Sequence, residues 1–373
     1  MNAPPRPHRH AAGFSLVEIM VAILVSLFLL AGVLQLYLGN QQTSRLGTGI
    51  GDLQQTGQFA VDELANNVRM AAFQGCADAI RAPAQVRALN APILPLPTDP
   101  GSIGGFEVAA NGTWTGGTAP ANWNGAVPRP LSDVLQVQGG SRAVVNLASD
   151  MGSESAQVAL ASNPDNIVAG EMVIVADCRT ADLFRVTSVT GGLTLVHTTS
   201  DNSSANLSKA YTDNFTAANT IDLNAAQAMR FNSWVYFVRD TGRDAADGSA
   251  IFALFRLDTS RTGQTAQELV EGVEYLQVLY GERIGAQNIR YRTAPNVADW
   301  SRVVAVKLAL LAGSRDPVLD AADATAGYVL LDQTVAKSGT AGATITYPDD
   351  RRLRRVFTAT VNIRNRRDLP DNP

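Results

Sequence analysis

The sequence predicts an α+β protein: a long N-terminal helix, with a membrane half and an amphipathic half, packed on an antiparallel β-sheet domain that carries a loop-rich β insertion. Three observations predict this fold. A nearly continuous apolar segment comes first, helical spacing of apolar residues follows it, and the last third alternates apolar and polar residues with strand periodicity. We therefore expect a short N-terminal segment, a helix, the insertion and the sheet domain over residues 1–13, 14–74, 75–230 and 231–373, respectively.

The composition narrows the class of protein. The 373 residues are 46% hydrophobic and 17% charged, and that charged fraction lies below the roughly 25% usual for globular chains. Low charge together with 31 glycines favours β-rich architecture outside the cytosol. The net charge of -4 argues against a general nucleic-acid binder, so no specific nucleic-acid partner is expected.

Residues 14–38 form a candidate transmembrane helix. At 1.5 Å per residue they span about 37 Å, enough to cross a hydrocarbon core of roughly 30 Å. Arg6 and Arg9 precede the segment, and the positive-inside rule keeps that end in the cytoplasm. We expect a single-pass inner-membrane protein whose chain after about Asn40 is periplasmic.

Glu18 is unusual in such a segment, because a carboxylate in hydrocarbon costs roughly 3 kcal/mol. An ordinary secretory signal has a shorter apolar region with a cleavage site after it, whereas the plausible cut here, between Gly13 and Phe14, precedes it. A plain signal anchor needs only length and basic flanks, but it has no use for Glu18.

The stretch "GFSLVEIMVAILV" resembles the class III signal of type IV pilins and type II secretion pseudopilins. The resemblance implies that a prepilin peptidase cuts after Gly13, which removes residues 1–13 as a leader peptide, and that the new N-terminal Phe14 is N-methylated. Glu18 then lies about 6 Å along the helix axis from the new ammonium group. Because losing one partner of a buried charge pair is expensive, we interpret Glu18 as an assembly device that sets register in a bundle of like helices.

The amphipathic half of the helix is predicted by an apolar stripe with helical spacing, formed by Leu53, Ala60, Leu64, Val68 and Ala71. Four glycines interrupt this half at positions 47, 49, 51 and 57, and each costs about 1 kcal/mol relative to alanine. We expect a weak or kinked point near residues 46–51.

Strand-like runs continue to the C-terminus. In the insertion they are "DVLQVQ", "EMVIVADC" and "DLFRVTSV", with a hairpin across Gly191 and Gly192. In the last third, "FNSWVYFVRD" and "AIFALFRLD" are predicted to pair, and they are followed by "VEYLQVLYGE", "RVVAVKLALLAG" and "RVFTATVNIRNR". Their alternation indicates an antiparallel sheet with one buried face, which the amphipathic helix covers.

The two cysteines, Cys76 and Cys178, both follow the apolar segment. Translocation to an oxidising compartment favours a disulfide that ties the helix end to the middle region, and two unpaired buried thiols are the alternative. The chain-entropy model values closure of a loop of about 100 residues near 4.7 kcal/mol.

Other chemistry-bearing residues favour structural interpretations. His197, the one histidine after the proposed cut, lies in an alternating run, and no metal-ligand cluster is apparent, so we expect neither an enzyme nor a cofactor. Asp240, Asp244 and Asp247 miss the EF-hand spacing, so a polar hairpin loop is favoured over calcium binding. Solvated strand flanks are favoured over a basic patch for the arginines at positions 351, 352, 354, 355, 364, 366 and 367.

Four later stretches resemble the PilW-type minor pilins of type IV pili, although most of residues 80–170 match nothing in that group. They are "GQFAVDELANNVRMAAFQGC", "ADCRTADLFRVTSV", "ELVEGVEYLQVLYGE" and "RRLRRVFTATVNIRNR". The resemblance implies a subunit that starts pilus assembly in a priming or tip complex with other minor pilins, the major pilin and in some systems a tip adhesin. Twitching motility, adhesion and DNA uptake would depend on that assembly.

Three alternatives stay open. A type II secretion minor pseudopilin of the J family shares the core segment, but members generally lack so long a middle insertion. A membrane-anchored binding module that never enters a filament would not be cleaved. An adhesin-like tip subunit that binds a surface or DNA through residues 77–230 is compatible with the main hypothesis.

Overall fold

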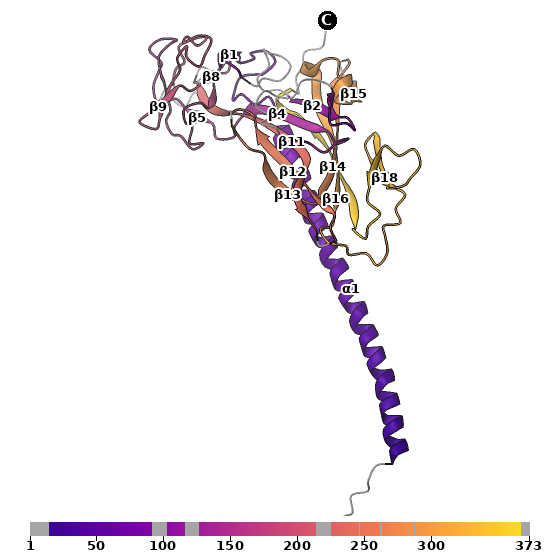
Figure 1. Ribbon diagram of the computed structural model, residues 1–373. Helices are drawn as coiled ribbons and strands as arrows, with labels where there is room; N and C mark the ends of the chain where they lie inside the picture. Colours follow the sequence, from indigo (N-terminus) through magenta and orange to yellow (C-terminus); the bar gives the residue numbers. More distant parts are fainter. Residues whose placement is uncertain are drawn as a thin grey trace, which may run out of the picture.

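The computed structural model describes residues 15–91, 103–115, 127–213, 225–245, 247–261, 263–285 and 288–366. One long helix projects from a β-rich body, and the small strands of the insertion lie at the end of the molecule farthest from the start of the helix (Figure 1). The α+β prediction is therefore confirmed. Gly13 and Phe14, where the cut is expected, lie outside the described residues.

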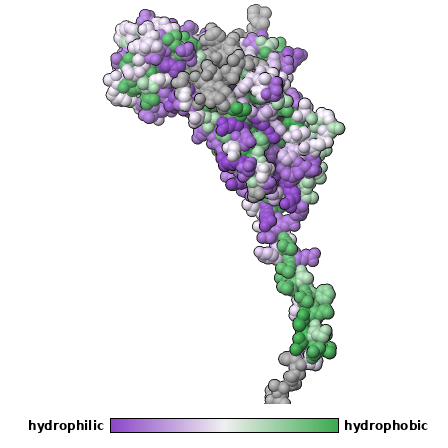
Figure 2. Space-filling model, in the orientation of Figure 1, coloured by the Kyte–Doolittle hydropathy of each residue, from purple (hydrophilic) through white to green (hydrophobic). Residues whose placement is uncertain are grey.

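Helix α1 runs from Leu16 to Arg69 without a break. Its 54 residues correspond to about 81 Å at 1.5 Å per residue. Ser15 caps the N-terminus, since its side chain accepts a hydrogen bond from the Glu18 N–H at 3.2 Å. Among the residues that the structure describes, no side chain of the β-rich body buries the helix before residue 42, which is the hydrophobic end of the molecule (Figure 2).

The glycines of α1 do not interrupt it: the helix continues through residues 46–51, and the weak or kinked point expected there stays a prediction. Two of them are packing positions instead. A Cβ atom on Gly57 would lie 2.2 Å from the Phe357 ring, and one on Gly49 would lie 2.9 Å from Val318. Both glycines therefore let the helix approach the sheet domain closely.

The amphipathic half of α1 packs on a four-stranded antiparallel sheet, as predicted. The strand order is β15-β14-β16-β20, with β14 Val273–Arg283, β15 Ile289–Arg292, β16 Val303–Gly313 and β20 Arg354–Asn362. Ala60, Leu64 and Val68 of the helix are fully buried against Leu276 and Leu308 of the sheet.

The opposite face of this sheet is also buried over most of β14 and β16, whereas Thr358 and Thr360 of β20 are exposed, so the expectation of one buried face was only partly correct. A three-stranded sheet covers it, formed by β17 Gly327–Leu330, β18 Gln333–Lys337 and β19 Ile345–Tyr347. Leu311 packs there against Leu330 and Val335. The nearly continuous apolar run of β16 is typical of a strand covered on both sides.

A ten-stranded sheet is organised around β11, which runs from Gln227 to Asp244. It pairs antiparallel with β12 Ala250–Asp258, β4 Val134–Gly140 and β7 Met172–Ala176, so the predicted pairing of "FNSWVYFVRD" with "AIFALFRLD" is confirmed. The remaining strands are β1 Gln85–Val86, β2 Ile103–Val108, β3 Trp114–Thr115, β5 Val145–Asn146, β8 Ala181–Arg185 and β13 Gln267–Glu271. One strand thus crosses the division that we placed between residues 230 and 231.

The head of the molecule, residues 144–211, has its own small core around Val173, Phe184 and Leu195. Its three-stranded sheet consists of β6 Val158–Ala159, β9 Ser188–Thr190 and β10 Thr194–Val196, and the predicted hairpin across Gly191 and Gly192 is present. Three short 3-10 helices complete the described chain: η1 Ala294–Asn296, η2 Trp300–Arg302 and η3 Arg364–Arg366.

Candidate functional site

Glu18 lies in the first turn of α1, in the exposed apolar half. Among the described residues its carboxylate has no ion-pair partner. Ala22 and Ser26 follow at intervals of four residues on the same side of the helix, beside Ile23 and Leu27. The Ser26 hydroxyl donates a hydrogen bond to the Ala22 carbonyl at 2.7 Å, so this hydroxyl is satisfied by the helix itself. Among Glu18, Ala22 and Ser26, Glu18 is therefore the side chain whose partner must come from outside the described residues.

Cys76 and Cys178 form a disulfide in the structure, with their Cα atoms 4.6 Å apart. It links the turn that follows α1 to the end of β7, across a sequence separation of 102. Beside it, the buried carboxylate of Asp177 accepts a bond from Lys209 at 2.6 Å. The helix end and the head are therefore joined by a covalent bond in addition to the intervening chain.

No described group of three or more His, Cys, Asp or Glu residues could hold a metal ion. Two of the three aspartates considered for calcium, Asp240 and Asp247, have other uses in their loop. Asp240 accepts a bond from the Gly242 N–H at 2.8 Å, and Asp247 accepts from Ser249 and pairs with Arg352 at 3.6 Å.

His197 is buried in the head directly after β10. Its Nε2 lies 2.9 Å from the Ala156 carbonyl, and its ring packs against Phe184 with centroids 5.0 Å apart. Burial is the largest effect on the ring and lowers the pKa of His197 below its ordinary value. The residue is a core side chain of the head.

The arginines near β20 divide into two groups, so the expectation of solvated flanks was only partly correct. Arg354 is buried and makes paired hydrogen bonds with Glu274 (2.9 and 3.1 Å) and with Asp350 (2.6 and 2.8 Å). Arg366 is buried against the Trp300 carbonyl, and burial lowers its pKa to about 10. Arg352 is also buried and pairs with Asp247, whereas the exposed members are Arg351, Arg355 and Arg364, and position 367 lies outside the described residues.

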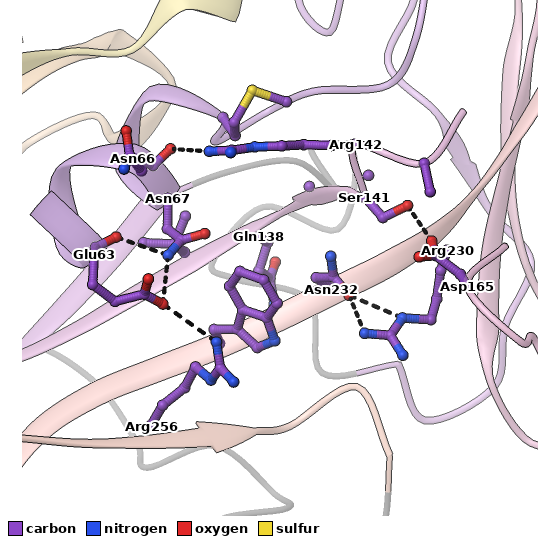
Figure 3. A pocket seen from close by; sticks show the side chains of 16 residues that line it. Glu63, Asn66, Asn67, Gln138, Ser141, Arg142, Asp165, Arg230, Asn232 and Arg256 are labelled. Atoms are coloured by element: carbon purple, nitrogen blue, oxygen red, sulfur yellow. Dashed lines mark hydrogen bonds and ion pairs between the residues drawn. The ribbon is translucent and has the colours of Figure 1, made fainter. Parts of the chain in front are cut away.

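A polar pocket of about 450 Å³ lies at the C-terminal end of α1, beside its last two turns, on the face of the ten-stranded sheet that meets the helix (Figure 3). Arg230, Asn232 and Trp234 line it from alternate positions of β11, because successive side chains of a strand point to opposite faces. Glu63, Asn66 and Asn67, in the last two turns of α1, form another wall of the pocket.

Hydrogen bonds hold the walls of this pocket, as Figure 3 shows. Arg256 donates to Glu63 at 3.3 Å, and Asn67 donates to the same carboxylate at 3.0 Å. On the other side Arg230 donates twice to the Asn232 side-chain oxygen, at 3.0 and 3.1 Å. Sequence reasoning missed this site, although two polar residues on one face of an otherwise apolar strand were a signal for it.

Comparison with known proteins gives two matches. Residues 235–365 match the family model described as type IV pilus-assembly protein W (PilW), from within β11 to η3. Residues 8–34 match the prokaryotic N-terminal methylation motif, which includes the expected cut and the first turns of α1. Searches of curated proteins and of solved structures returned no match.

Proposed function

This chain is a PilW-type pilin-like protein, a minor pilin related to type IV pili, and from that premise we propose that it helps to initiate pilus assembly in a priming or tip complex. The partners would be other minor pilins, the major pilin and a tip adhesin where one is present. The pilin-family matches point to a structural rather than a catalytic protein.

The observation that carries the proposal is the exposed apolar half of α1 with Glu18 in its first turn. An apolar surface of this length needs either lipid or a bundle of similar helices around it. A carboxylate within that surface is tolerated when a cation neutralises it, and the cut at Gly13 would supply an ammonium group within one helical turn or from a neighbouring subunit.

The proposed sequence of events starts in the inner membrane, with the N-terminus in the cytoplasm and the β-rich body in the periplasm. Prepilin peptidase cuts after Gly13, and Phe14 is methylated. The helix then moves from lipid into the helical bundle of the filament, where the head lies farthest from the membrane end of α1. Twitching motility, adhesion and DNA uptake follow as consequences of filament formation.

The test is N-terminal mass analysis of this protein recovered from sheared filaments. We expect a methylated Phe14 as the first residue, which requires both processing and incorporation. Recovery of chains that all retain Met1, or absence of the protein from filaments in piliated cells, would contradict the proposal and favour a plain membrane anchor.

A type II secretion pseudopilin is the competing assignment. Deletion of the gene separates the two, because the pilus role predicts loss of surface filaments with normal protein secretion. Loss of secretion with normal piliation would overturn the pilus assignment while leaving the processing steps intact.

A further inference from the structure

We propose that the polar pocket at the end of α1 binds a sugar that carries a carboxylate. Its volume of about 450 Å³ falls within the roughly 300–1,000 Å³ range of small-molecule sites. Such sites are usually lined by apolar side chains, whereas this one is lined mainly by arginine, asparagine and carboxylate groups. The lining therefore excludes an apolar ligand.

Several polar groups of the pocket are left for a ligand. The Asn232 side chain is 8% exposed, and its oxygen is used by Arg230, while its amide nitrogen has no partner among the described residues. The Trp234 indole nitrogen likewise has no hydrogen-bond partner there. Arg142 is exposed and makes one long bond, 3.4 Å, to the Asn66 carbonyl. At the same rim the Asp165 carboxylate accepts from Ser141 through one oxygen, and its second oxygen has no hydrogen-bond partner in the described part of the chain.

These groups specify the ligand chemistry. A hydroxyl both donates and accepts, so the hydroxyls of a sugar ring match the Asn232 amide and the Trp234 indole as donors and the Asp165 oxygen as an acceptor. Arg230 lies 3.6 Å from the buried Glu171 carboxylate and Arg256 pairs with Glu63, so Arg142 is the arginine of the lining that has no carboxylate partner among the described residues and is left for a negative group on the ligand. A carboxylate beside Arg142 would form charge-assisted hydrogen bonds.

The arrangement favours a sugar over a peptide. A peptide commonly binds by adding a strand to a free sheet edge, but β11 is paired on both sides, with β4 on one side and with β7 and then β12 on the other. The floor of the pocket therefore offers side chains and no open backbone edge. Its walls are already fixed by internal bonds such as Glu63–Arg256, so binding would order few additional side chains.

The test uses the full chain purified in detergent, titrated with galacturonic acid, with galactose and with an acidic hexapeptide by isothermal calorimetry and saturation-transfer NMR. We expect saturable binding of galacturonic acid, and galactose should bind at least about tenfold more weakly because it lacks the charge-assisted bonds. Arg142→Ala and Trp234→Phe should each weaken galacturonic acid binding, by about tenfold for the first.

The matched control is Arg81→Ala, since Arg81 has a side chain that is 71% exposed and lies outside the pocket. This variant should bind like the unaltered protein, and circular dichroism should show all three variants folded. Absence of saturable binding, equal affinity for galactose, equal loss in the control, or tighter binding of the hexapeptide would each overturn the proposal. None of these outcomes depends on filament assembly, so the test is independent of the proposed function.

Discussion

Glu18 is the residue on which the assembly hypothesis depends, and its removal gives the most direct test. Glu18→Ala should leave membrane insertion intact, because the apolar segment keeps its length, while incorporation into filaments falls by at least about tenfold. The reason is that leaving one partner of a buried charge pair uncompensated costs about 3–5 kcal/mol. The measurement compares the protein in sheared filaments with that in membranes. Asp62→Ala, on the exposed side of the same helix, is the control, and equal incorporation of both variants would refute the role.

His197 makes the head sensitive to acid. Because burial lowers its pKa in the folded state, the unfolded chain takes up more protons as the pH falls below about 6.5. The contribution of neutral His197 to the free energy of unfolding is therefore fully present above that pH. It is lost as the pH falls toward the pKa of His197 in the folded protein.

We expect His197→Gln to flatten the decline in the unfolding midpoint between pH 7 and pH 5, measured by urea denaturation. The variant will be somewhat less stable at pH 7 if the Ala156 contact is lost, so the slope against pH is the decisive quantity. An unchanged slope would mean that other groups control the acid response.

At the scale of elements, the glycines of α1 allow a matched comparison. Gly57→Ala should destabilise the protein, because the new Cβ would lie 2.2 Å from the Phe357 ring and overpacking costs about 1–3 kcal/mol. Gly51→Ala meets no atom within 4 Å and should stabilise the helix by up to about 1 kcal/mol. Urea unfolding of the full chain in detergent measures both changes, and effects of the same sign would contradict this packing account.

The spacing of apolar residues predicted a helix or strand well where the pattern lies within that one element. The apolar and amphipathic halves of α1, the β11–β12 pair and the β14–β16–β20 sheet follow from periodicity within each segment. The layer that covers the other face of that sheet could not be predicted in this way. The strands that pack on a continuous apolar run are determined by contacts between residues far apart in the sequence. Gly57 was taken for a helix weakness for the same reason, since its partner Phe357 lies 300 residues away in sequence.

At the scale of the whole molecule, the disulfide joins helix and head. The double variant Cys76→Ser/Cys178→Ser should lose about 4–5 kcal/mol in the free energy of unfolding, according to the chain-entropy model for a loop of this length. The measurement is urea unfolding with and without a thiol reductant. Reductant should weaken the unaltered protein and leave the double variant unchanged, and equal midpoints without reductant would refute the contribution.

The candidate sites differ in how far the sequence revealed them. Glu18 is conspicuous because it is a carboxylate in an apolar segment. The cysteines are conspicuous because the chain has only two of them. The pocket forms where the end of α1, strand β11 and the loop that carries Ser141 come together. These segments are far apart in the sequence, so no pattern within one segment predicts the pocket. Polar residues on an apolar strand could have marked its floor, but not its walls.

The covalent link between Cys76 and Cys178 also determines how the protein bears mechanical load. Tension between the membrane end of α1 and the C-terminal sheet passes from Cys76 directly to Cys178. The segment between the two cysteines therefore carries no tension. Without the disulfide it could unfold and lengthen the chain by about 340 Å at full extension. A subunit pulled from its base therefore stays short for as long as that bond survives.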